Sequence, residues 1–359
     1  NLSSPSIRYN ALVFQTLNLK FNANEHELVL NGDMTKFNFT EKAFIPNVII
    51  HSTASNNLIQ TELQLANADS FPNRAHLKAG MQFYSASRFD LKFDSSTIIL
   101  RNKLWNINAS NIVAFDTSSI RFSSLNFSNK LESVEVDGTI GKSIEENLEL
   151  TFQNFDMNNL DPLFQLGKSR IGGTINGNMI LNEARKNLKA ETDLIISDLV
   201  LNGDTLGNAS LVSRYNNEYK IVVANIGITK GSAKIFELKG NYYAAKEDNN
   251  LDFDLKISNL YLQTIEPYIN EILSEVKGKV SANLKLTGTL EKPIIEGSVD
   301  LIRATCVVNY LNTKYSLSNT VKVKKNIFDL SGVTVIDKDN NEAKVKGEIT
   351  HDYFDHFAF

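Results

Sequence analysis

The feature that most constrains this chain is a two-residue period of apolar side chains that runs through most of its length. It is clear in segments such as IQTELQLA (Ile59–Ala66) and LDFDLKI (Leu251–Ile257), and turn signals such as Asn31-Gly32 separate these segments. Apolar residues at every second position place one face of a strand against other apolar groups and the other face in water. The pattern therefore predicts an almost all-β chain built of antiparallel hairpins.

Composition excludes several classes of protein. The 359 residues carry 41 acidic and 37 basic side chains, with no long basic cluster, which argues against binding to nucleic acid or to anionic headgroups. The single cysteine, Cys306, excludes an internal disulfide and a cysteine-based zinc site. The longest apolar runs, such as Ile221–Ile228, fall far short of the roughly 20 residues of a transmembrane helix. Because the chain starts at Asn1 and ends in mid-pattern, we expect a fragment of a longer polypeptide whose anchors lie outside it.

Two proline-containing segments break the alternation, and both are predicted to form short amphipathic helices. They are Leu160–Gly167 and Ile265–Val276, each with an acidic residue and a proline near its start. Pro162 and Pro267 are 105 residues apart, and the flanking sequence matches at this offset without a gap. The matched pairs are Leu148 and Phe253, Leu150 and Leu255, Phe152 and Ile257, Asn154 and Asn259, Leu160 and Ile265, Ile171 and Val276, Gly173 and Gly278, Ile175 and Val280, Met179 and Leu284, and Leu181 and Leu286.

A second marker recurs at nearly the same interval. The pattern apolar-x-apolar-x-glycine ends at Gly32, Gly138, Gly240 and Gly347, with spacings of 106, 102 and 107 residues. Near-equal intervals favour a repeat architecture over coincidence. We predict one continuous repetitive β fragment over residues 1–359, with approximate repeats near 1–137, 138–239 and 240–346 and the start of another at 347–359.

A repeat of this length restricts the fold. A β-sandwich covers one sheet with another, and a β-helix repeats every 20 to 30 residues or so, whereas a long rolled meander suits a unit of several hairpins plus a short helix. With about 11 residues per strand and turn and about 4.8 Å per strand, the chain would hold roughly 30 strands over about 150 Å. We therefore expect an all-β fold, a long repetitive antiparallel sheet rolled into an elongated open trough (a repeating β-groove) with a few short helices.

The apolar face of such a sheet would line the trough. A long concave apolar surface is unstable in water, at about 25 cal/mol per Å², unless a ligand covers it. Acyl chains suit it because they need continuous apolar contact and no specific hydrogen bonds. The residues expected to line the lipid groove are Leu28, Leu30, Leu63, Leu65, Val134, Val136, Leu148, Leu150, Phe152, Ile175, Met179, Leu181, Phe253, Leu255, Ile257, Val280, Leu284 and Leu286.

One stretch of the chain carries a family resemblance. Its elements are the turn Gly288-Thr289 with Pro293 and Gly297, the run NYLNTKYSL (Asn309–Leu317), the set Asp337, Asn341 and Ala343, and the ending Gly347, Ile349 and His351. Over about residues 251–351 the chain resembles the C-terminal part of the TamB (translocation and assembly module) proteins, members of the AsmA-like group. Before about residue 250 it shares with them only the general alternation of apolar and polar residues.

The resemblance implies a function and a location. It implies a periplasmic protein of a Gram-negative bacterium, anchored in the inner membrane through a segment outside this chain and reaching the outer membrane. Such proteins are similar to bridge-like lipid transfer proteins, whose apolar trough carries phospholipid chains between membranes. The implied partners are phospholipids and an outer-membrane barrel of the assembly-factor (TamA/BamA-like) type, contacted through regions outside this chain, with a further role in outer-membrane protein assembly.

Other interpretations stay open or are less well matched. Alternation alone does not separate a lipid-lined trough from a packed core, so a periplasmic strut or a chaperone-like module for barrel or adhesin assembly is the alternative. An outer-membrane barrel would show aromatic girdles, and a β-solenoid enzyme would show clustered carboxylates on short coils. None of the five histidines lies in a metal-binding motif, and Gly172–Gly177 is interpreted as a turn. We expect no enzymatic activity, no cofactor and no metal.

Overall fold

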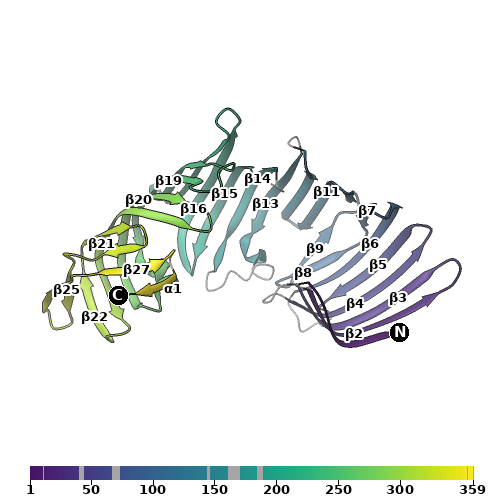
Figure 1. The fold of residues 1–359 in the computed structure, drawn as a ribbon, viewed down its shortest axis with the longest axis horizontal. Coiled ribbons are helices and arrows are strands. Elements are labelled where there is room, and N and C mark those ends of the chain that lie inside the picture. Colours follow the sequence, from purple (N-terminus) through teal and green to yellow (C-terminus); the bar gives the residue numbers. More distant parts are fainter. Residues whose placement is uncertain are drawn as a thin grey trace. The chain divides into compact units, whose positions relative to one another are not determined.

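The computed structural model describes residues 1–10, 12–39, 44–66, 73–143, 146–160, 170–183, 189–353 and 355–358. The chain divides into two compact units, of which the first comprises residues 1–165 and 176–188 and the second residues 166–175 and 189–359. Each unit, taken by itself, contains a curved antiparallel β-sheet (Figure 1). In neither unit do the described strands form a second sheet packed on the first.

The first unit is a meander that divides at β6 and rejoins at β11, which pairs with both β9 and β10. On β6, Met81 pairs with Leu91 of β7, whereas His76 pairs with Thr97 of β8. The two halves of β6 therefore pair with two different strands. The strands are β1 (Leu2–Tyr9), β2 (Leu12–Ala23), β3 (Leu28–Asn38), β4 (Phe44–Ser55), β5 (Leu58–Leu65), β6 (Arg74–Ser85), β7 (Arg88–Phe93), β8 (Thr97–Leu100), β9 (Lys103–Ile107), β10 (Ile112–Phe115), β11 (Ile120–Asn129), β12 (Glu132–Ile140) and β13 (Asn147–Asp156). The 3₁₀ turn η1 (Met157–Leu160) follows β13.

The second unit continues the meander, and its long strands pair in chain order from β15 to β21. Beyond β21 the sheet branches, because β21 pairs with both β22 and β23. The strands are β15 (Lys189–Leu201), β16 (Asp204–Asn216), β17 (Ile221–Lys230), β18 (Ala233–Tyr242), β19 (Leu251–Tyr261), β20 (Leu273–Gly288), β21 (Pro293–Val308), β22 (Thr313–Leu317), β23 (Thr320–Lys324), β24 (Ile327–Asp329), β25 (Thr334–Asp337), β26 (Glu342–Lys344), β27 (Glu348–Asp352) and β28 (Asp355–Ala358).

Strand β14 (Ile171–Asn182) contributes residues to both units. It contains Gly172–Gly177, so the expected turn at this glycine-rich stretch is wrong. Gly173 and Gly177 have φ angles of 133° and 118°, which only glycine adopts without strain. The strand continues through these glycines.

The predicted helices are shorter than expected. The first, Leu160–Gly167, lies outside the described residues apart from Leu160, where η1 ends. In place of the second there are two single turns, η2 (Leu262–Ile265) and α1 (Glu266–Ile269), with the proline at the start of α1 as expected. From Leu273 onward the chain is strand, because Leu273 pairs with Val308 of β21. Sheet pairing therefore overrides the helical spacing of Ile272 and Val276.

Irregularities of the backbone recur 105 residues apart. Asn154 and Asn259 both have positive φ (48° and 52°), and so do Asp198 and Arg303 (50° and 47°). The amide of Asn154 donates to Asn176 Oδ1 (2.8 Å), and the amide of Asn259 donates to Ser281 Oγ (3.0 Å) at the matching offset. The turns η1 and η2 also begin 105 residues apart. The offset read from the sequence is thus a spacing of real structural features, while the repeat boundaries themselves stay a prediction.

Two glycines in this pattern let neighbouring strands approach closely. A Cβ on Gly278 would lie 2.6 Å from Arg303 O and 2.8 Å from Ala304 Cα. At the matched position, a Cβ on Gly173 would lie 3.0 Å from Ser197 O. Each glycine therefore faces the backbone of a bulged strand, where no side chain fits.

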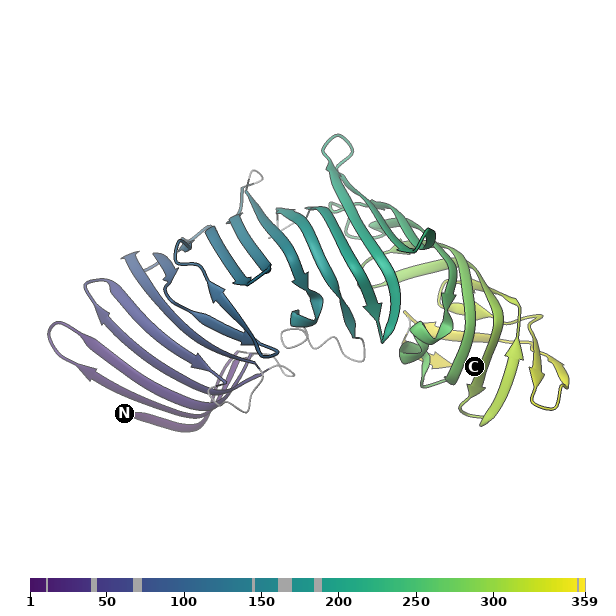
Figure 2. The same ribbon diagram turned by 180° about the vertical axis from the view of Figure 1, so that it is seen from behind.

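The core of each unit is a thin apolar layer on one face of its sheet. In the first unit Ile107, Val113 and Leu125 are buried together, and Trp105 packs against Phe155 at a ring distance of 5.8 Å. In the second unit the buried cluster contains Leu262 of η2 and Val280 of β20. Figure 2 shows η2 and α1 on the inner side of the curved sheet of this unit. The face they contact is thus the concave one.

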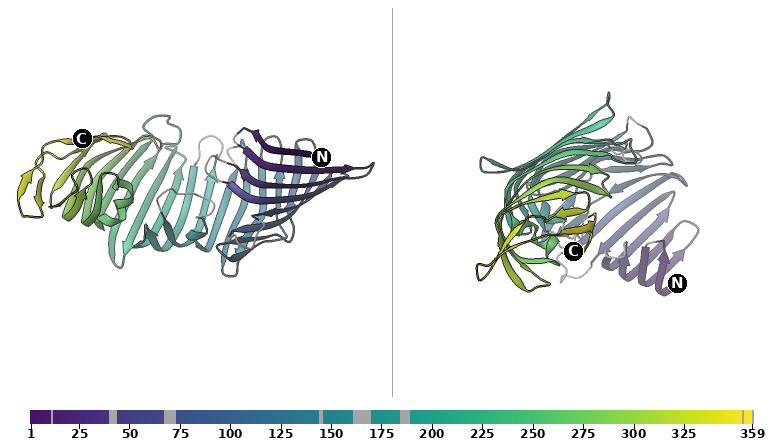
Figure 3. Two further views of the ribbon diagram at one scale, coloured as in Figure 1. Left: turned by 90° about the horizontal axis from the view of Figure 1, so that it is seen from below. Right: turned by 60° about the vertical axis from the view of Figure 1, so that its left-hand side comes forward.

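These observations confirm the expected fold class. The chain is all-β, its strands form antiparallel ladders, and the helices among the described residues are single turns. The sheet of each unit is curved, as the turned views show (Figure 3). The trough-like form is therefore present within each unit.

Candidate functional site: an apolar face on each unit

The residues predicted to line a groove differ in burial. Leu148, Ile175, Phe253 and Val280 are buried. Leu28 is 42% exposed, and the other thirteen are half-buried. The four buried residues form two pairs at the 105-residue offset, Leu148 with Phe253 and Ile175 with Val280. The most buried positions thus recur together with the repeat.

In the first unit the predicted residues share one face. Directly opposed residues on antiparallel strands point to the same side of a sheet, and a row of such partners crosses ten strands from β2 to β13. The row is Ala23, Leu28, Ala54, Ile59, Met81, Leu91, Val113, Phe122, Gly138 and Leu148. Seven more of the predicted residues lie on the same face, because each is an even number of positions along its strand from a member of the row. They are Leu30, Leu63, Leu65, Val134, Val136, Leu150 and Phe152.

The second unit carries a row of the same kind. It also crosses ten strands, and its members are Leu194, Leu211, Ile226, Leu238, Leu255, Leu284, Gly297, Val323, Phe328 and Ile349. Phe253, Ile257, Val280 and Leu286 lie on the same face, two or four residues along their strands. At about 4.8 Å between strands, each row extends about 43 Å along its sheet.

The three predicted residues of β14 are not tied to either row. Ile175 is buried, and Met179 and Leu181 are half-buried. No described ladder of β14 places them on the face of a row, so their position along a shared face stays a prediction.

Helical turns cover the apolar face of the second unit at one end of its strands. There Leu262, Ile265 and Ile269 of the helical turns pack on Val276 and Val280. Farther along β19 and β20, Leu255 and Leu284 of the row are half-buried. The middle of the row thus presents side chains that are neither in a closed core nor fully in water.

A buried polar residue anchors each helical turn to its unit, a feature that the sequence analysis did not identify. Asn159 of η1 is fully buried, and its Nδ2 donates to Glu132 Oε2 (2.8 Å). Thr264 of η2, at the 105-residue offset, is 1% exposed, and its Oγ1 donates to Asp204 Oδ2 (2.8 Å). The signal was present, because the sequence match extends to the neighbouring pair Leu160 and Ile265.

The anchor of η1 belongs to a larger ionic network. Lys103 Nζ lies 2.8 Å from Glu132 Oε1 and 3.1 Å from Asp156 Oδ2. The hydrogen bond to Glu132 raises the pKa of Lys103. Burial raises the pKa of Asp156, but hydrogen bonds from Asn158 and Lys103 outweigh it and lower that pKa overall. The Asp156 carboxylate therefore stays ionised, and the network holds η1 against the strand ends.

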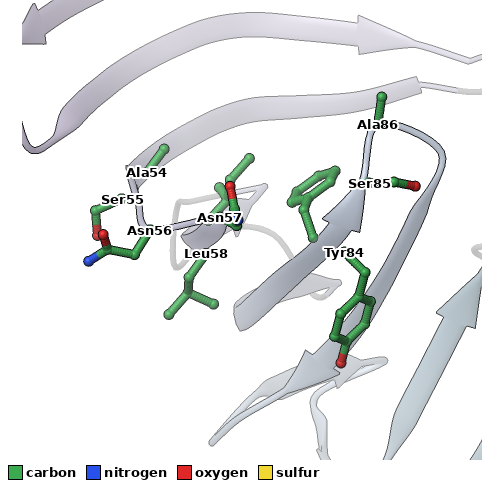
Figure 4. A pocket seen from close by; sticks show the side chains of 10 residues that line it. Ala54, Ser55, Asn56, Asn57, Leu58, Tyr84, Ser85 and Ala86 are labelled. Atoms are coloured by element: carbon green, nitrogen blue, oxygen red, sulfur yellow. The ribbon is translucent and has the colours of Figure 1, made fainter.

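A hollow of about 560 Å³ opens beside the apolar row of the first unit (Figure 4). It lies between the β4–β5 turn and the end of β6, and Ala54, Ile59 and Phe83 contribute apolar surface to it. Phe83 stacks on Phe89 at 5.0 Å, and Phe89 stacks on Phe115 at 4.6 Å. An aromatic stack thus borders the row at this end of the strands.

The opposite face of the second unit is polar and ion-paired. Glu237 of β18 contacts Lys234 (2.6 Å) and Lys239 (2.7 Å), whose hydrogen bonds lower its pKa to about 2. Lys285 bridges Asp252 (2.5 Å) and Asp254 (3.1 Å). One face is therefore apolar and the other is charged, as alternation requires.

The described residues show neither a metal-binding cluster nor a membrane-spanning helix. Among them no cluster of three or more His, Cys, Asp or Glu side chains is arranged to hold a metal ion. Burial raises the pKa of Cys306, which disfavours its thiolate. Within the same residues, no helix has the length and apolar character needed to cross a bilayer.

A family comparison agrees with this geometry. Residues 135–301 match the family model of the TamB N-terminal domain. The match covers somewhat less than half of the chain and confirms the resemblance to TamB proteins. It supports a TamB-like, envelope-associated role for a chain with this apolar face. No curated protein and no solved structure matches the chain.

The match corrects where the resemblance lies. It overlaps the expected stretch 251–351 only at 251–301. Most of it falls before residue 251, where the resemblance had consisted only of alternating apolar and polar residues. The model is that of the N-terminal domain of TamB, whereas the motifs had indicated the C-terminal part. The matched segment contains both members of the 105-residue pairs from Leu148 and Phe253 to Leu181 and Leu286. It also contains the turn Gly288-Thr289 with Pro293 and Gly297, whereas the motifs from Asn309 onward lie outside it.

Proposed function

We propose that this chain is part of a TamB-like, envelope-spanning lipid-transfer bridge. Its apolar face carries the acyl chains of phospholipids between the inner and outer membranes, and the polar headgroups remain in water. It acts in the periplasm of a Gram-negative bacterium, without enzymatic chemistry. Regions outside this chain anchor it in the inner membrane and contact an outer-membrane barrel of the TamA/BamA-like type, where it aids outer-membrane protein assembly.

The observation that carries this proposal is the row of apolar partners across ten strands in each unit. Such a row gives continuous contact to an alkyl chain and offers it no hydrogen-bond donor or acceptor. In the described strands no second sheet covers the row, and Leu255 and Leu284 are only half-buried. Exposing apolar area to water costs about 25 cal/mol per Å². A bound acyl chain therefore stabilises the apolar face by removing it from water. The match to TamB favours lipid over an unrelated apolar ligand.

The experiment places charge on the row. In the double variant Leu255→Asp, Ile257→Asp, two carboxylates lie on the apolar face, and we expect loss of co-purifying phospholipid and of transfer between vesicles. Circular dichroism should show the native β spectrum, because half-buried positions let the carboxylates stay hydrated. In a closed core the same carboxylates would be buried without partners and would unfold the unit.

The matched control is Asn283→Asp on the opposite face of β20, beside Lys256. It adds charge without touching the apolar row, so lipid content and transfer should equal those of the unaltered chain. Absence of phospholipid from the unaltered chain, by extraction and mass spectrometry, would refute lipid transfer and leave the strut or the assembly chaperone.

A further inference from the structure

A further hollow of the first unit, of about 790 Å³, lies at the ends of strands β6, β7, β10, β11 and β12. Asp90, Ala114, Arg121 and Thr139 line it and are direct partners on neighbouring strands. Each is one residue away from a member of the apolar row, so they lie on the polar face of the sheet. Because it lies at the strand ends, this space is called the rim hollow.

The rim hollow also reaches the apolar face. Phe115, the last residue of β10, lines it and lies two positions from Val113 of the apolar row. Phe115 stacks on Phe89 (4.6 Å), and Phe89 stacks on Phe83 (5.0 Å), which lines the hollow of Figure 4. Tyr84 borders both hollows. An aromatic stack thus joins the rim hollow to the apolar row, so a ligand that fits both must be amphipathic.

Two guanidinium groups line the rim hollow without a carboxylate partner among the residues that the structure describes. Arg88 lies over the ring of Tyr84, with its Cζ 5.5 Å from the ring centroid. Arg121 is exposed and forms no hydrogen bond or ion pair within the same residues. Guanidinium groups bind phosphate through two parallel N–H donors. The rim hollow therefore offers two groups that suit a phosphate.

The three carboxylates of the rim hollow accept hydrogen bonds from uncharged donors instead. Asp90 Oδ2 accepts from the Tyr84 hydroxyl (3.0 Å), and Glu146 Oε2 accepts from the Ser143 amide (2.9 Å). Asp116 accepts four bonds from the turn that follows it. Asp90 and Glu146 each use one oxygen in these bonds, and a carboxylate has about four lone-pair sites on its two oxygens. Both can therefore accept further bonds from a cationic group of a ligand.

The charges of the rim hollow restrict its ligand further. Two guanidinium groups and three carboxylates give it a net charge of −1, which repels an isolated phosphate. A zwitterion that carries an ammonium group beside its phosphate brings no net charge and offers a partner to both kinds of group. The aromatic stack requires an apolar part in addition. A phospholipid with an amine in its headgroup has all three features.

Resting on the proposed function, we propose that the rim hollow binds the headgroup of a phospholipid that carries both a phosphate and an amine. Arg88 and Arg121 bind the phosphate, and Asp90 and Glu146 accept hydrogen bonds from the ammonium group. The acyl chains pass over Phe115 and continue onto the apolar row. Headgroup recognition is thus placed beside an apolar face that does not distinguish one acyl chain from another.

Photocrosslinking at the rim hollow tests the proposal. A benzophenone amino acid replaces Thr117, an exposed residue that lines the hollow and has no part in the proposed binding. The full chain is mixed with vesicles of equal parts phosphatidylethanolamine and phosphatidylglycerol, in which one lipid or the other is radiolabelled. Phosphatidylglycerol lacks the ammonium group. We therefore expect phosphatidylethanolamine to label Thr117 about tenfold more strongly, the factor that one charge-assisted hydrogen bond supplies.

Removal of the carboxylates tests the role of the amine. Asp90→Asn with Glu146→Gln keeps the shape of both side chains and changes the net charge of the hollow from −1 to +1, so the preference for phosphatidylethanolamine should be lost. Asp94→Asn, at an exposed residue outside the hollow, is the matched control and should keep the preference. An unchanged preference in the folded double variant, as judged by circular dichroism, would refute the proposal.

Removal of the guanidinium groups tests the role of the phosphate. Both lipids carry a phosphate, so Arg88→Gln with Arg121→Gln should lower the labelling of Thr117 by each of them about tenfold. Lys92→Gln, which removes an exposed cation of β7 outside the hollow, should leave the labelling unchanged. Undiminished labelling in the folded arginine variant would overturn the assignment of these residues.

A competition arm separates a lipid headgroup from free phosphate. Glycerophosphoethanolamine, which is the headgroup without acyl chains, should reduce the labelling of Thr117. Inorganic phosphate at the same concentration should not reduce it, because it lacks the cation that the carboxylates require. Equal competition by the two compounds would show a site for phosphate alone and refute the role of the amine.

A probe at Leu150, on the apolar face, keeps this proposal distinct from lipid transfer. Labelling at Leu150 without labelling at Thr117, or with equal labelling of Thr117 by the two lipids, would overturn the headgroup site and leave lipid binding intact. No labelling at Leu150 would overturn lipid binding on the apolar face, and the headgroup site with it.

Discussion

Replacing Gly278 with alanine should strongly destabilise the chain. Gly278 has a φ of 110°, where an L-residue costs of order 1–3 kcal/mol. Its new Cβ would lie 2.6 Å from Arg303 O and 2.8 Å from Ala304 Cα, both backbone atoms that move only if β21 moves. Such overpacking costs about 1–3 kcal/mol more, so we expect a loss of about 4 kcal/mol in unfolding free energy.

The magnitude is measured by urea denaturation followed by circular dichroism. Gly227→Ala on β17 is the matched control, because its Cβ would meet only Ser210 Oγ, at an ordinary 3.5 Å. That change should be neutral or stabilise by up to about 1 kcal/mol. Gly173→Ala should fall between the two, since its nearest backbone contact is 3.0 Å. Equal midpoints for Gly278→Ala and Gly227→Ala would refute the argument that the bulged strand requires a glycine here.

Two further predictions concern packing and pH. Changing Trp105, which is 2% exposed, to alanine should lower the unfolding free energy by about 3–5 kcal/mol. Leu131→Ala, at a side chain that is 80% exposed, should change it by less than about 0.5 kcal/mol. Similar urea midpoints for the two variants would contradict this prediction. The pKa of Glu237 is lowered to about 2 by Lys234 and Lys239, so its stabilising contribution is complete above the ordinary pKa of 4.5 and is lost as the pH falls toward 2. Glu237→Gln should therefore flatten the acid limb of the stability profile over this range, and an unchanged limb would contradict the assignment.

The sequence predicted the fold well because period-two alternation is a direct record of which face is buried. The shared face of Val134, Val136, Leu148 and Leu150 follows from alternation alone, and pairing confirms it. The 105-residue offset read from the sequence also relates structural features, because the four buried residues among those predicted to line a groove form two matched pairs. Both inferences depend on local patterns that tertiary structure preserves.

The failures occurred where distant pairing decides the local structure. Ile272 and Val276 have helical spacing, but β21 draws this segment into a strand. The branch at β6, which pairs with both β7 and β8, leaves no local signal. The bonds of Asn159 and Thr264 join residues 27 and 60 positions apart, and a single polar side chain in an alternating sequence does not reveal such a partner. Burial of these polar groups is a property of the assembled sheet.

The constant offset between matched bulges has a consequence for how such a chain changes length. Because Asn154 and Asn259 occupy the same place in the same kind of bulge, a genetic crossover between these points would remove or add 105 residues and leave every flanking strand with its inward and outward sides unchanged. A crossover one residue out of phase would turn the following strands inside out. Recombination between such matched positions can therefore shorten or lengthen this architecture by 105 residues without reversing the two faces of the sheet.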